Sequence, residues 1–534
     1  MGKSYGECSR QLPINGTATS QKRGQIPQHR VNARLFTGLL TGGLLGVLLA
    51  GCQTRPPLPP QQVGLTPSFS GQSATTAQLD TAWWQQFNDP QLTALVELAA
   101  QNNQDVMLAV LRLRQAQAGL TVNQSRLLPS VAAVGSLSQS ESDLPPAVKQ
   151  GQPDTTARRA SLNLSWDLDL FGANRAARDA ATLEAEAAEL GMQGMQLLVV
   201  SDVVRQYVLW QATAERLRLL GSLRDVQAQT LRLTERRYRE GLTSQFELSL
   251  AQAELSNLEA QLPALSNLLQ VTQNRLAILT GQNPSAASVL LTAKPANEWP
   301  QQLEIQAGQP IELLQRRPDL QAAERQLRAA NATLAAAQAE RFPKLMLSAV
   351  WGQQKLTLNG LGLAASPYSN AAIAFSQPLL NRKAIYANIE AKTAAEQIAL
   401  TQYEKTILNA LEQVENSLAA QQFEQQRFAQ LDQTVQARQQ SRRHAESLYR
   451  EGLTGLLPLL DVQRSVVAAE LGLLDSRSQR WLNAVNLYQA LGGGWQALPV
   501  PAAQQPFTSK NTTSLSMPTR QPNAVTNTVA VGES

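Results

Sequence analysis

The segment SLNLSWDLDL, residues 161–170, alternates strictly between apolar and polar side chains. Serine, asparagine or aspartate occupies every position between the apolar ones, which are Leu162, Leu164, Trp166, Leu168 and Leu170. About ten residues of such alternation are typical of a β-strand that faces lipid on one side and water on the other. In isolation, the same pattern also suits an edge strand of a soluble sheet.

Three further stretches, near residues 130–140, 345–357 and 370–380, alternate more weakly, and Gln377 and Pro378 interrupt the last of them. Together they favour the membrane interpretation. Four strands cannot close a barrel, and an open sheet edge in hydrocarbon leaves backbone groups without hydrogen bonds. We therefore predict that protomers share one barrel. Two protomers would give eight strands and three would give twelve, and the sequence permits either.

The chain contains two copies of one plan. The hexapeptide YREGLT begins at Tyr238 and again at Tyr449, 211 residues later. When the halves are aligned on it, DVMLAVLRLRQAQA from Asp105 faces DLQAAERQLRAANA from Asp319. Each half reads as a helix, two short strands and two long helices, and this period is too long for a solenoid repeat.

The copies and the composition of the termini divide the chain into six parts. They are a signal peptide at residues 1–51, a lipidated N-terminal segment at 52–88, a first repeat at 89–281, a linker at 282–310, a second repeat at 311–495 and a polar tail at 496–534. The tail is rich in Ser, Thr, Pro, Asn and Gln and has few charges or aromatics. This composition predicts disorder.

Residues 176–239 and 383–450 contain no proline, so we predict two nearly unbroken helices, each on the order of 100 Å long. The helices that follow them carry apolar residues every seven positions, which implies left-handed coiled packing. These positions are Leu248, Leu255, Leu262, Leu269 and Leu276 in the first repeat, and Leu460, Val467, Leu474, Trp481 and Tyr488 in the second. A second seam, broken at Arg480, consists of Leu459, Val466, Leu473 and Leu487. Two seams suit a helix in a cylindrical wall, and one wide apolar face in a solid bundle is the alternative.

The repeated YREGLT predicts the tip of a helical hairpin. A long helix ends at Tyr-Arg-Glu, glycine takes the left-handed position beyond the end, and Thr or Ser caps the next helix. The residues assigned to the two tips are Gly241, Thr243, Gly452 and Thr454. Ser244 and Glu247 have the spacing of a capping box.

The N-terminus reads as a secretory signal. Residues 1–34 carry six basic residues and one acid, and an apolar run then ends in LLAGC at residues 48–52. This run is shorter than the roughly 20 residues that a membrane helix needs. The ending resembles a bacterial lipobox, in which Cys52 becomes the lipidated first residue, and an uncleaved anchor is the alternative.

The mature chain offers little for catalysis or metal binding. Without residues 1–51 it has 40 basic and 40 acidic residues, which leaves no footprint for nucleic acid. Because Cys52 would be acylated and His444 is the only remaining histidine, we expect no metal site, no His-based triad and no cofactor beyond the lipid. Asp167 and Asp169 could be paired catalytic carboxylates, but the alternation accounts for them as polar residues that line a lumen.

The two tips differ in one helix face. Leu457, Asp461 and Arg464 stand at i, i+4 and i+7 after the second tip. The equivalent positions in the first repeat are Phe246, Leu250 and Ala253. Rotational symmetry would turn this face into an apolar, an acidic and a basic ring. Periodicity alone favours a solvated helix face with one internal ion pair.

Several stretches resemble the outer-membrane efflux proteins, specifically the lipoprotein channels of tripartite drug efflux pumps, which are distant relatives of TolC. They are RRPDLQAAERQLRAANA at residues 316–332, LDLFG at 168–172, the paired YREGLT and NLYQALGGGW at 486–495. The resemblance covers roughly residues 78–495. It implies a mainly helical fold with a membrane β-barrel portion, in which duplicated protomers form a trimer with a twelve-stranded barrel and a twelve-helix tunnel.

The resemblance also implies partners and a gate. The trimer would dock at its tips with a periplasmic adaptor, or membrane fusion protein, and with an inner-membrane transporter. The residues that match the family's closed tip are Tyr449, Arg450, Leu457, Asp461 and Arg464. Asp461 would accept hydrogen bonds from Tyr449 or Arg450, while Leu457 and Arg464 would form constricting rings. Gln53 after the lipid cysteine resembles lipoproteins sorted to the outer membrane.

The sequence therefore predicts an outer-membrane exit duct for drugs or other small toxic compounds, anchored by lipid and extending into the periplasm. A duct for type I protein secretion is the alternative of similar fold, and the lipobox and LGGGW favour drug efflux over it. A lipid-anchored adaptor with one coiled-coil hairpin is a second alternative. Two hairpins and the alternation at residues 161–170 argue against it.

Overall fold

The computed structural model describes residues 56–70, 80–141, 143, 145, 154–285, 291, 293, 305 and 307–496. They belong to one compact unit that begins at Thr54. The signal segment, Cys52, Gln53 and the tail beyond residue 496 lie outside the described residues, so the interpretations of those parts stay predictions.

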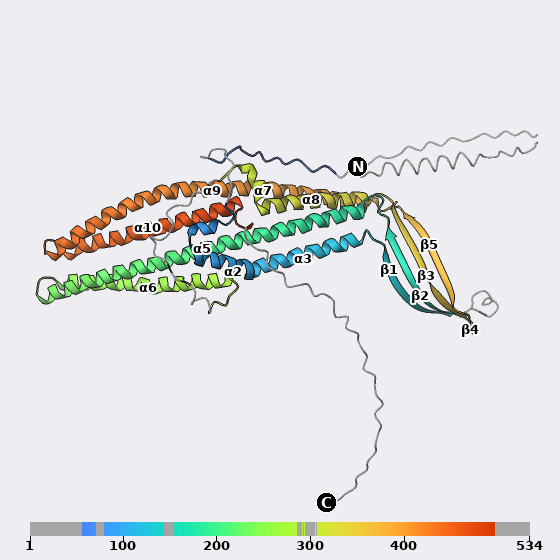
Figure 1. The fold of residues 1–534 in the computed structure, drawn as a ribbon, viewed down its shortest axis with the longest axis horizontal. Helices are drawn as coiled ribbons and strands as arrows, with labels where there is room; N and C mark the ends of the chain where they lie inside the picture. The colour runs from blue at the N-terminus through green and yellow to red at the C-terminus, as the bar shows by residue number, and fades with distance from the viewer. Residues whose placement is uncertain are drawn as a thin grey trace, which may run out of the picture. The chain divides into compact units, whose positions relative to one another are not determined.

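The described elements follow the predicted duplication (Figure 1). The first half contains η1 (Trp83–Phe87), α2 (Pro90–Asn102), α3 (Gln104–Ser125), β1 (Ser130–Ser140), β2 (Thr155–Asp167), α5 (Ala173–Arg239) and α6 (Gln245–Leu279). The second half contains η4 (Pro310–Glu312), α7 (Leu313–Arg316), α8 (Pro318–Ala339), β3 (Lys344–Leu358), β4 (Leu361–Gly362), β5 (Ser366–Ser376), α9 (Arg382–Arg450) and α10 (Leu456–Leu491). Each half thus has a helix, two main strands and two long helices, in that order.

The long helices form a layer. α5 has 67 residues and α9 has 69, and both end where the sequence predicts. α5 packs against α3, α6, α8 and α10, whereas α9 packs against α8 and α10. α3 and α6 therefore lie at one edge of the layer and α9 at the other. No helix in the described part of the chain is both long enough and apolar enough to cross a membrane.

Residues from both predicted apolar seams of α10 pack into hydrophobic cores. Trp481 and Tyr488 lie in a core shared with α2 and α5, together with the N-terminal Trp83 and Phe87. Leu487 lies in a second core, shared with α8 and α9. α10 thus has packing partners on two sides within one chain.

The strands form an antiparallel sheet in the order β1-β2-β3-β5, with β4 paired to the end of β3. Directly opposed residues share a face, and the register gathers most apolar side chains on one face. They include Val131, Leu137, Leu162, Leu164, Trp166, Leu345, Leu347, Trp351, Ile373 and Phe375. The opposite face carries Ser161, Asn163, Ser165 and Ser348. Trp351 on this face is 69% exposed, so no described part of the chain covers it.

Two strand boundaries differ from the prediction. β2 begins at Thr155 and ends at Asp167, so the last three alternating residues lie beyond it, where the chain turns towards α5. β5 ends at Ser376. Gln377 and Pro378 therefore follow the strand and do not interrupt it, in keeping with a proline that lacks the N–H a ladder needs.

Candidate functional site

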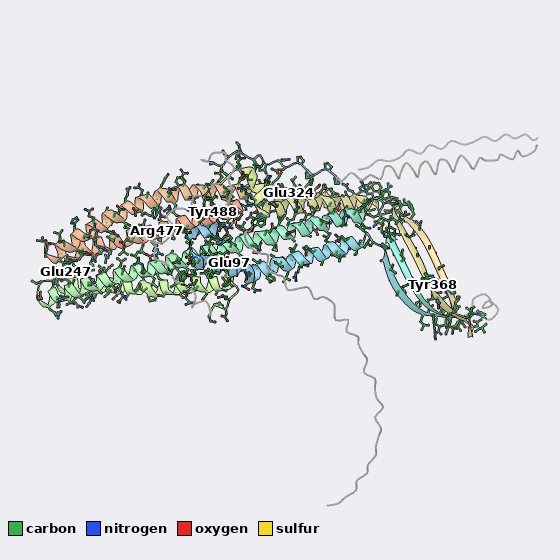
Figure 2. All side chains as sticks on the ribbon, in the orientation of Figure 1. Glu97, Glu247, Glu324, Tyr368, Arg477 and Tyr488 are labelled. Carbon is green, nitrogen blue, oxygen red and sulfur yellow. The ribbon has the colours of Figure 1, made fainter. Side chains whose placement is uncertain are left out.

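The two YREGLT segments form the hairpin tips, at the end of the helices opposite the strands (Figure 1). Figure 2 labels Glu247 at this end and Tyr368 on the strands. Gly241 has a φ of +76° and Gly452 a φ of +74°, which confirms the predicted left-handed positions. The Leu242 N–H donates to Arg237 O at 2.8 Å, and the second tip repeats this bond 211 residues later at 2.9 Å. These bonds close both helices with a Schellman-type motif.

The cap of the helix after the first tip agrees with the prediction, whereas the cap after the second tip does not. In the first tip Ser244 is the cap, and its hydroxyl accepts the Glu247 N–H at 3.3 Å. Thr243 instead donates its hydroxyl to the Glu247 carboxylate. In the second tip Gly455, not Thr454, is the cap residue of α10, and it has no side chain to contribute. The prediction that Thr or Ser restarts both helices is therefore wrong for the second.

The Glu247 carboxylate crosses to the second hairpin. Its Oε1 accepts the backbone N–H of Leu456, the first residue of α10, at 3.4 Å. The predicted capping box is thus only half formed, because Ser244 caps Glu247 but Glu247 serves the neighbouring helix. One carboxylate of the first repeat consequently stabilises the start of the second tip helix.

Tyr449 fixes the end of α9 to α5. Its side chain is 2% exposed, and its hydroxyl lies 3.0 Å from Thr234 Oγ1. The Arg237 guanidinium donates to the Tyr449 carbonyl at 3.1 Å and stands 4.9 Å from the centre of the Tyr449 ring. Tyr449 also packs with Ala251 and Leu460 in an apolar cluster. The two hairpins are therefore joined at the tip by polar and apolar contacts.

Arg464 makes a further bridge between the hairpins. Its Nε donates to Glu254 Oε2 on α6 at 2.9 Å, and the side chain of Glu254 is only 11% exposed. This hydrogen bond to Glu254 raises the pKa of the Arg464 guanidinium above its ordinary value, and the nearby Asp461 carboxylate acts in the same direction. Arg464 is thus held against the first hairpin of its own chain.

The other predicted gate residues lie at the surface of the single chain. Arg450 is exposed and lies 4.0 Å from Glu446. Leu457 is exposed, and Asp461 has no hydrogen bond or ion pair among the described residues. Within one chain, Asp461 therefore accepts no bond from Tyr449 or Arg450. Links between subunits stay a prediction.

Apart from Glu247, which was named for a capping box, the sequence did not single out the residues that receive these contacts. Thr234 and Arg237 precede the first tip and break no pattern. Glu247 and Glu254 offered a signal, because acids seven residues apart on a largely apolar helix lie on one face. A partner helix could have been expected along that face.

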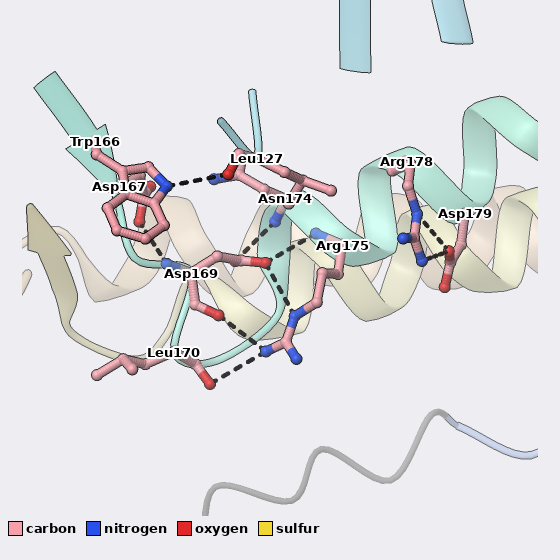
Figure 3. A network of polar contacts seen from close by, with 9 residues as sticks. All are labelled: Leu127, Trp166, Asp167, Asp169, Leu170, Asn174, Arg175, Arg178 and Asp179. Carbon is pink, nitrogen blue, oxygen red and sulfur yellow. Dashed lines mark hydrogen bonds and ion pairs between the residues drawn. The ribbon is translucent and has the colours of Figure 1, made fainter. Parts of the chain in front are cut away.

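Asp167 and Asp169 serve the start of α5 (Figure 3). Asp169 has a φ of +45°, and its carboxylate accepts the N–H groups of Asn174 and Arg175, both at 2.9 Å. Arg175 returns a bond from Nη2 to the Asp169 carbonyl, and the Asp169 N–H donates to Asp167 Oδ1 at 3.0 Å. The assignment of Asp169 to a lumen-lining strand position is therefore wrong, because its buried carboxylate caps a helix.

Some predictions concern chemistry that these contacts do not test. Cys52 lies outside the described residues, so its lipidation stays a prediction. In the part of the chain that the structure describes, no group of three or more His, Cys, Asp or Glu side chains could hold a metal ion. His444 is exposed on α9.

A layer of long helices with two open edges, continuous with a sheet that has one exposed apolar face, is the arrangement that the sequence predicts for an outer-membrane channel. The chain belongs to the outer membrane efflux protein family, whose model matches residues 95–282 and 310–493. Both repeats are thus covered, and the resemblance found in the sequence is confirmed.

Known relatives agree with this assignment. The chain is 33% identical over 467 residues to the pyoverdine export outer membrane protein OpmQ of Pseudomonas putida, covering 85% of this chain and 97% of that protein. It is 32% identical over 479 residues to the toluene efflux pump outer membrane protein TtgC of Pseudomonas putida, covering 88% and 98%. The solved outer-membrane channel OprN superposes with a TM-score of 0.76 at 28% identity, covering 82% of this chain and 99% of that one. The protein is therefore an efflux protein of the outer membrane, in a family of ducts rather than enzymes.

Proposed function

We propose that this protein is the exit duct of a tripartite efflux system, and that it conducts drugs or other small toxic compounds through a gated trimeric tunnel. The match of both repeats to the efflux family carries the proposal. Relatives named for pyoverdine export and toluene efflux support a small-molecule cargo. A periplasmic adaptor and an inner-membrane transporter dock at the tips, and the transporter supplies the energy.

The open edges of the protomer support assembly with further copies. β1 and β5 each pair on one side only, and unpaired strand edges are costly in hydrocarbon. The helix layer also exposes apolar side chains near both edges, namely Leu268, Val271 and Ile278 on α6 and Ile398, Leu408 and Phe423 on α9. Three copies of four main strands make a twelve-stranded barrel with room for a lumen, whereas two copies make a barrel that side chains would fill.

Covalent lipid on Cys52 anchors the mature chain in the outer membrane. The signal-like segment before Cys52 supports this step, and no other bound group is part of the proposal. Intact mass measurement of the purified protein checks it, because acylation adds a mass that a Cys52→Ser variant lacks. A wild-type mass without lipid would contradict the anchor but not the duct.

The resting gate consists of contacts at the tips. Tyr449 and Arg464 hold the second hairpin against the first within each protomer. Arg450, Leu457 and Asp461 are exposed in the single chain and are free to meet copies of the chain around a threefold axis. Opening of the tip requires that some of these contacts break.

A deletion strain tests the function. Loss of the gene is expected to sensitise cells to dyes and detergents, and a plasmid with the wild-type chain is expected to restore resistance. A plasmid with Trp351→Arg keeps both tips but places a charge on the apolar face of the sheet, so it is expected to restore less resistance, and Ser348→Arg on the opposite face is the matched control, expected to restore it fully. Unchanged sensitivity together with loss of a secreted protein would contradict the proposal and favour the type I secretion duct.

A further inference from the structure

The apolar face of the sheet carries two basic residues near the end that lies away from the helices (Figure 1). β2 and β3 pair without a break over residues 155–167, and the register places Arg158 directly opposite Lys355. Arg158 lies four residues from Leu162, and Lys355 lies four residues from Trp351, so all four share the apolar face. Both basic side chains are exposed. Two cations therefore stand next to each other on this face.

This basic pair has no counter-ion in the part of the chain that the structure describes. Neither Arg158 nor Lys355 makes a hydrogen bond or an ion pair there. The nearest acids along the two strands, Glu141 and Asp154, are about 13 Å further on, and the Glu141 carboxylate accepts a bond from Gln139. Like charges directly opposite each other destabilise a sheet. The pair is therefore expected to have an anionic partner from outside the chain.

The position of the pair indicates where this partner lies. Leu345 near the start of β3 and Lys355 share the apolar face, and they are about 33 Å apart along the strand. A strand tilt of roughly 35–45° reduces this distance to about 25 Å across a membrane, which is the height of the apolar band of a membrane barrel. The pair thus stands at the boundary between hydrocarbon and headgroups, where long basic side chains reach the headgroups.

The residues on either side of the pair indicate the chemistry of the partner. Leu137 stands directly opposite Arg158 on β1 and is 71% exposed, so an apolar side chain adjoins the two cations. Beyond the pair, a row of uncharged polar residues continues on the same face, namely Gln139, Thr156 and Thr357. Along the strands, the face therefore offers apolar surface, then two cations, then hydroxyl and amide groups. A phosphorylated glycolipid has acyl chains, phosphate and sugar hydroxyls in the same order.

We propose that Arg158 and Lys355 bind a phosphate group of the phosphorylated glycolipid in the outer leaflet of the outer membrane. This inference rests on the proposed duct, in which the helices extend into the periplasm and the far end of the sheet reaches the outer leaflet. The Cβ atoms of directly opposed residues are about 5 Å apart, so one phosphate can accept bonds from both side chains. The Arg158 guanidinium donates a planar pair of N–H groups to the phosphate oxygens, and the Lys355 ammonium adds a second positive charge.

Titration of the purified full-length oligomer with bisphosphorylated lipid A tests the proposal. The protein is stripped of lipid in mild detergent, and native mass spectrometry counts the bound lipid. We expect saturable binding that weakens about tenfold or more when Arg158→Gln and Lys355→Gln are combined, because charge-assisted hydrogen bonds are lost. Arg158→Lys keeps the charge and is expected to bind better than Arg158→Gln. The matched control is Arg159→Gln, which alters the next residue on the opposite face and is expected to bind as wild type.

Two further lipids separate the parts of the proposal. Lipid A without its phosphates is expected to bind about tenfold more weakly, and phosphatidylglycerol, which has a phosphate but no sugar, is expected to bind more weakly than lipid A. Equal affinity for phosphatidylglycerol and lipid A would overturn recognition of the glycolipid. Unchanged affinity in the double variant, or an equal loss in Arg159→Gln, would overturn the site.

Heat-resistant oligomers and restored resistance in the deletion strain show whether the proposed duct itself holds. If the wild-type chain gives neither, the duct and this site fail together. If it gives both but does not bind lipid A in preference to phosphatidylglycerol, only the glycolipid site is wrong.

Discussion

The contact between Tyr449 and Thr234 allows a prediction of unequal mutational effects. The Thr234 hydroxyl also lies 3.0 Å from the carbonyl of Thr230 on its own helix. A hydroxyl has one hydrogen, so Thr234 donates to Thr230 and the Tyr449 hydroxyl donates to Thr234 Oγ1. Both side chains are buried, Tyr449 at 2% and Thr234 at 0% exposure.

The direction of this hydrogen bond determines which substitution costs more stability. Tyr449→Phe removes a donor but leaves Thr234 bonded to its helix, at a cost of about 1 kcal/mol. Thr234→Val keeps the shape but leaves the Tyr449 O–H buried without an acceptor, at a cost of about 1–3 kcal/mol. The double variant has neither polar group, so its cost is expected to be no larger than that of Tyr449→Phe. The two substitutions are therefore strongly non-additive.

If the contact between Tyr449 and Thr234 breaks when the channel opens, each substitution destabilises the closed state only. The conductance of the reconstituted channel then measures the free-energy cost of the substitution. If the proposed trimer opens as one unit, a change of about 1 kcal/mol in each protomer shifts the opening equilibrium roughly a hundredfold. Tyr449→Phe is expected to raise the resting open fraction by up to this factor, Thr234→Val by more, and the double variant by no more than Tyr449→Phe. Heat-resistant oligomers on gels confirm that each variant has assembled.

Two results would refute this reasoning. If all three assembled variants conduct as the wild type does, the contact between Tyr449 and Thr234 persists in the open state. If the effects of the two single variants simply add in the double variant, the assigned direction of the hydrogen bond is wrong.

Three further predictions concern other parts of the chain. Asp169→Ala removes a cap worth about 1–2 kcal/mol, so hydrogen–deuterium exchange of the first α5 amides should quicken about tenfold, and unchanged exchange would exclude the capping role (Figure 3). If Asp461 links subunits as proposed, Asp461→Ala should raise resting conductance by removing charge-assisted bonds, and conductance at the wild-type level would mean that Asp461 is no latch. Trp351→Arg places a charge on the apolar face of the sheet at a cost of up to about 2–4 kcal/mol, and should reduce heat-resistant oligomers in outer-membrane fractions. Ser348→Arg on the opposite face should not, and equal losses would argue against a lipid-facing surface.

Much of the fold could be predicted because its signals are local. Alternation with a period of two residues predicted the strands. The absence of proline predicted α5 and α9 to within a few residues of their observed starts. Because the sequence is duplicated, each element could be predicted from two copies. The glycines of the tips were predictable because Gly241 and Gly452 need a left-handed backbone that other residues rarely adopt.

The end of β2 was not predictable from alternation. Leu168 and Leu170 continue the apolar period after the strand has stopped, because a turn at Asp169 changes the direction of the chain. What ends the strand is a carboxylate placed to accept two N–H groups of the next helix. Such a cap is recognisable only when the start of that helix is known to within a residue.

The contacts at the tips were not predictable for a different reason. Each joins residues from different hairpins, so it depends on how far one hairpin is displaced along the other. Comparing the repeats could not supply this displacement, since at least one residue of each contact differs between the repeats. Thr234 corresponds to Ala445 in the second repeat, and Arg464 corresponds to Ala253 in the first.

Because of these differences, the second hairpin depends on the first for its helix cap, whereas the first hairpin supplies its own. Ser244, the cap of α6, corresponds to Gly455, and Glu247 corresponds to Pro458, which has no N–H to be capped. α10 therefore lacks a side-chain cap of its own and takes the carboxylate of Glu247 from the first repeat. If the tip widens by movement of the second hairpin alone, it must give up this cap together with the contact at Tyr449. If the two hairpins move as one body, both contacts survive, and unchanged conductance of the assembled Tyr449 and Thr234 variants is the result that this second mode of opening requires.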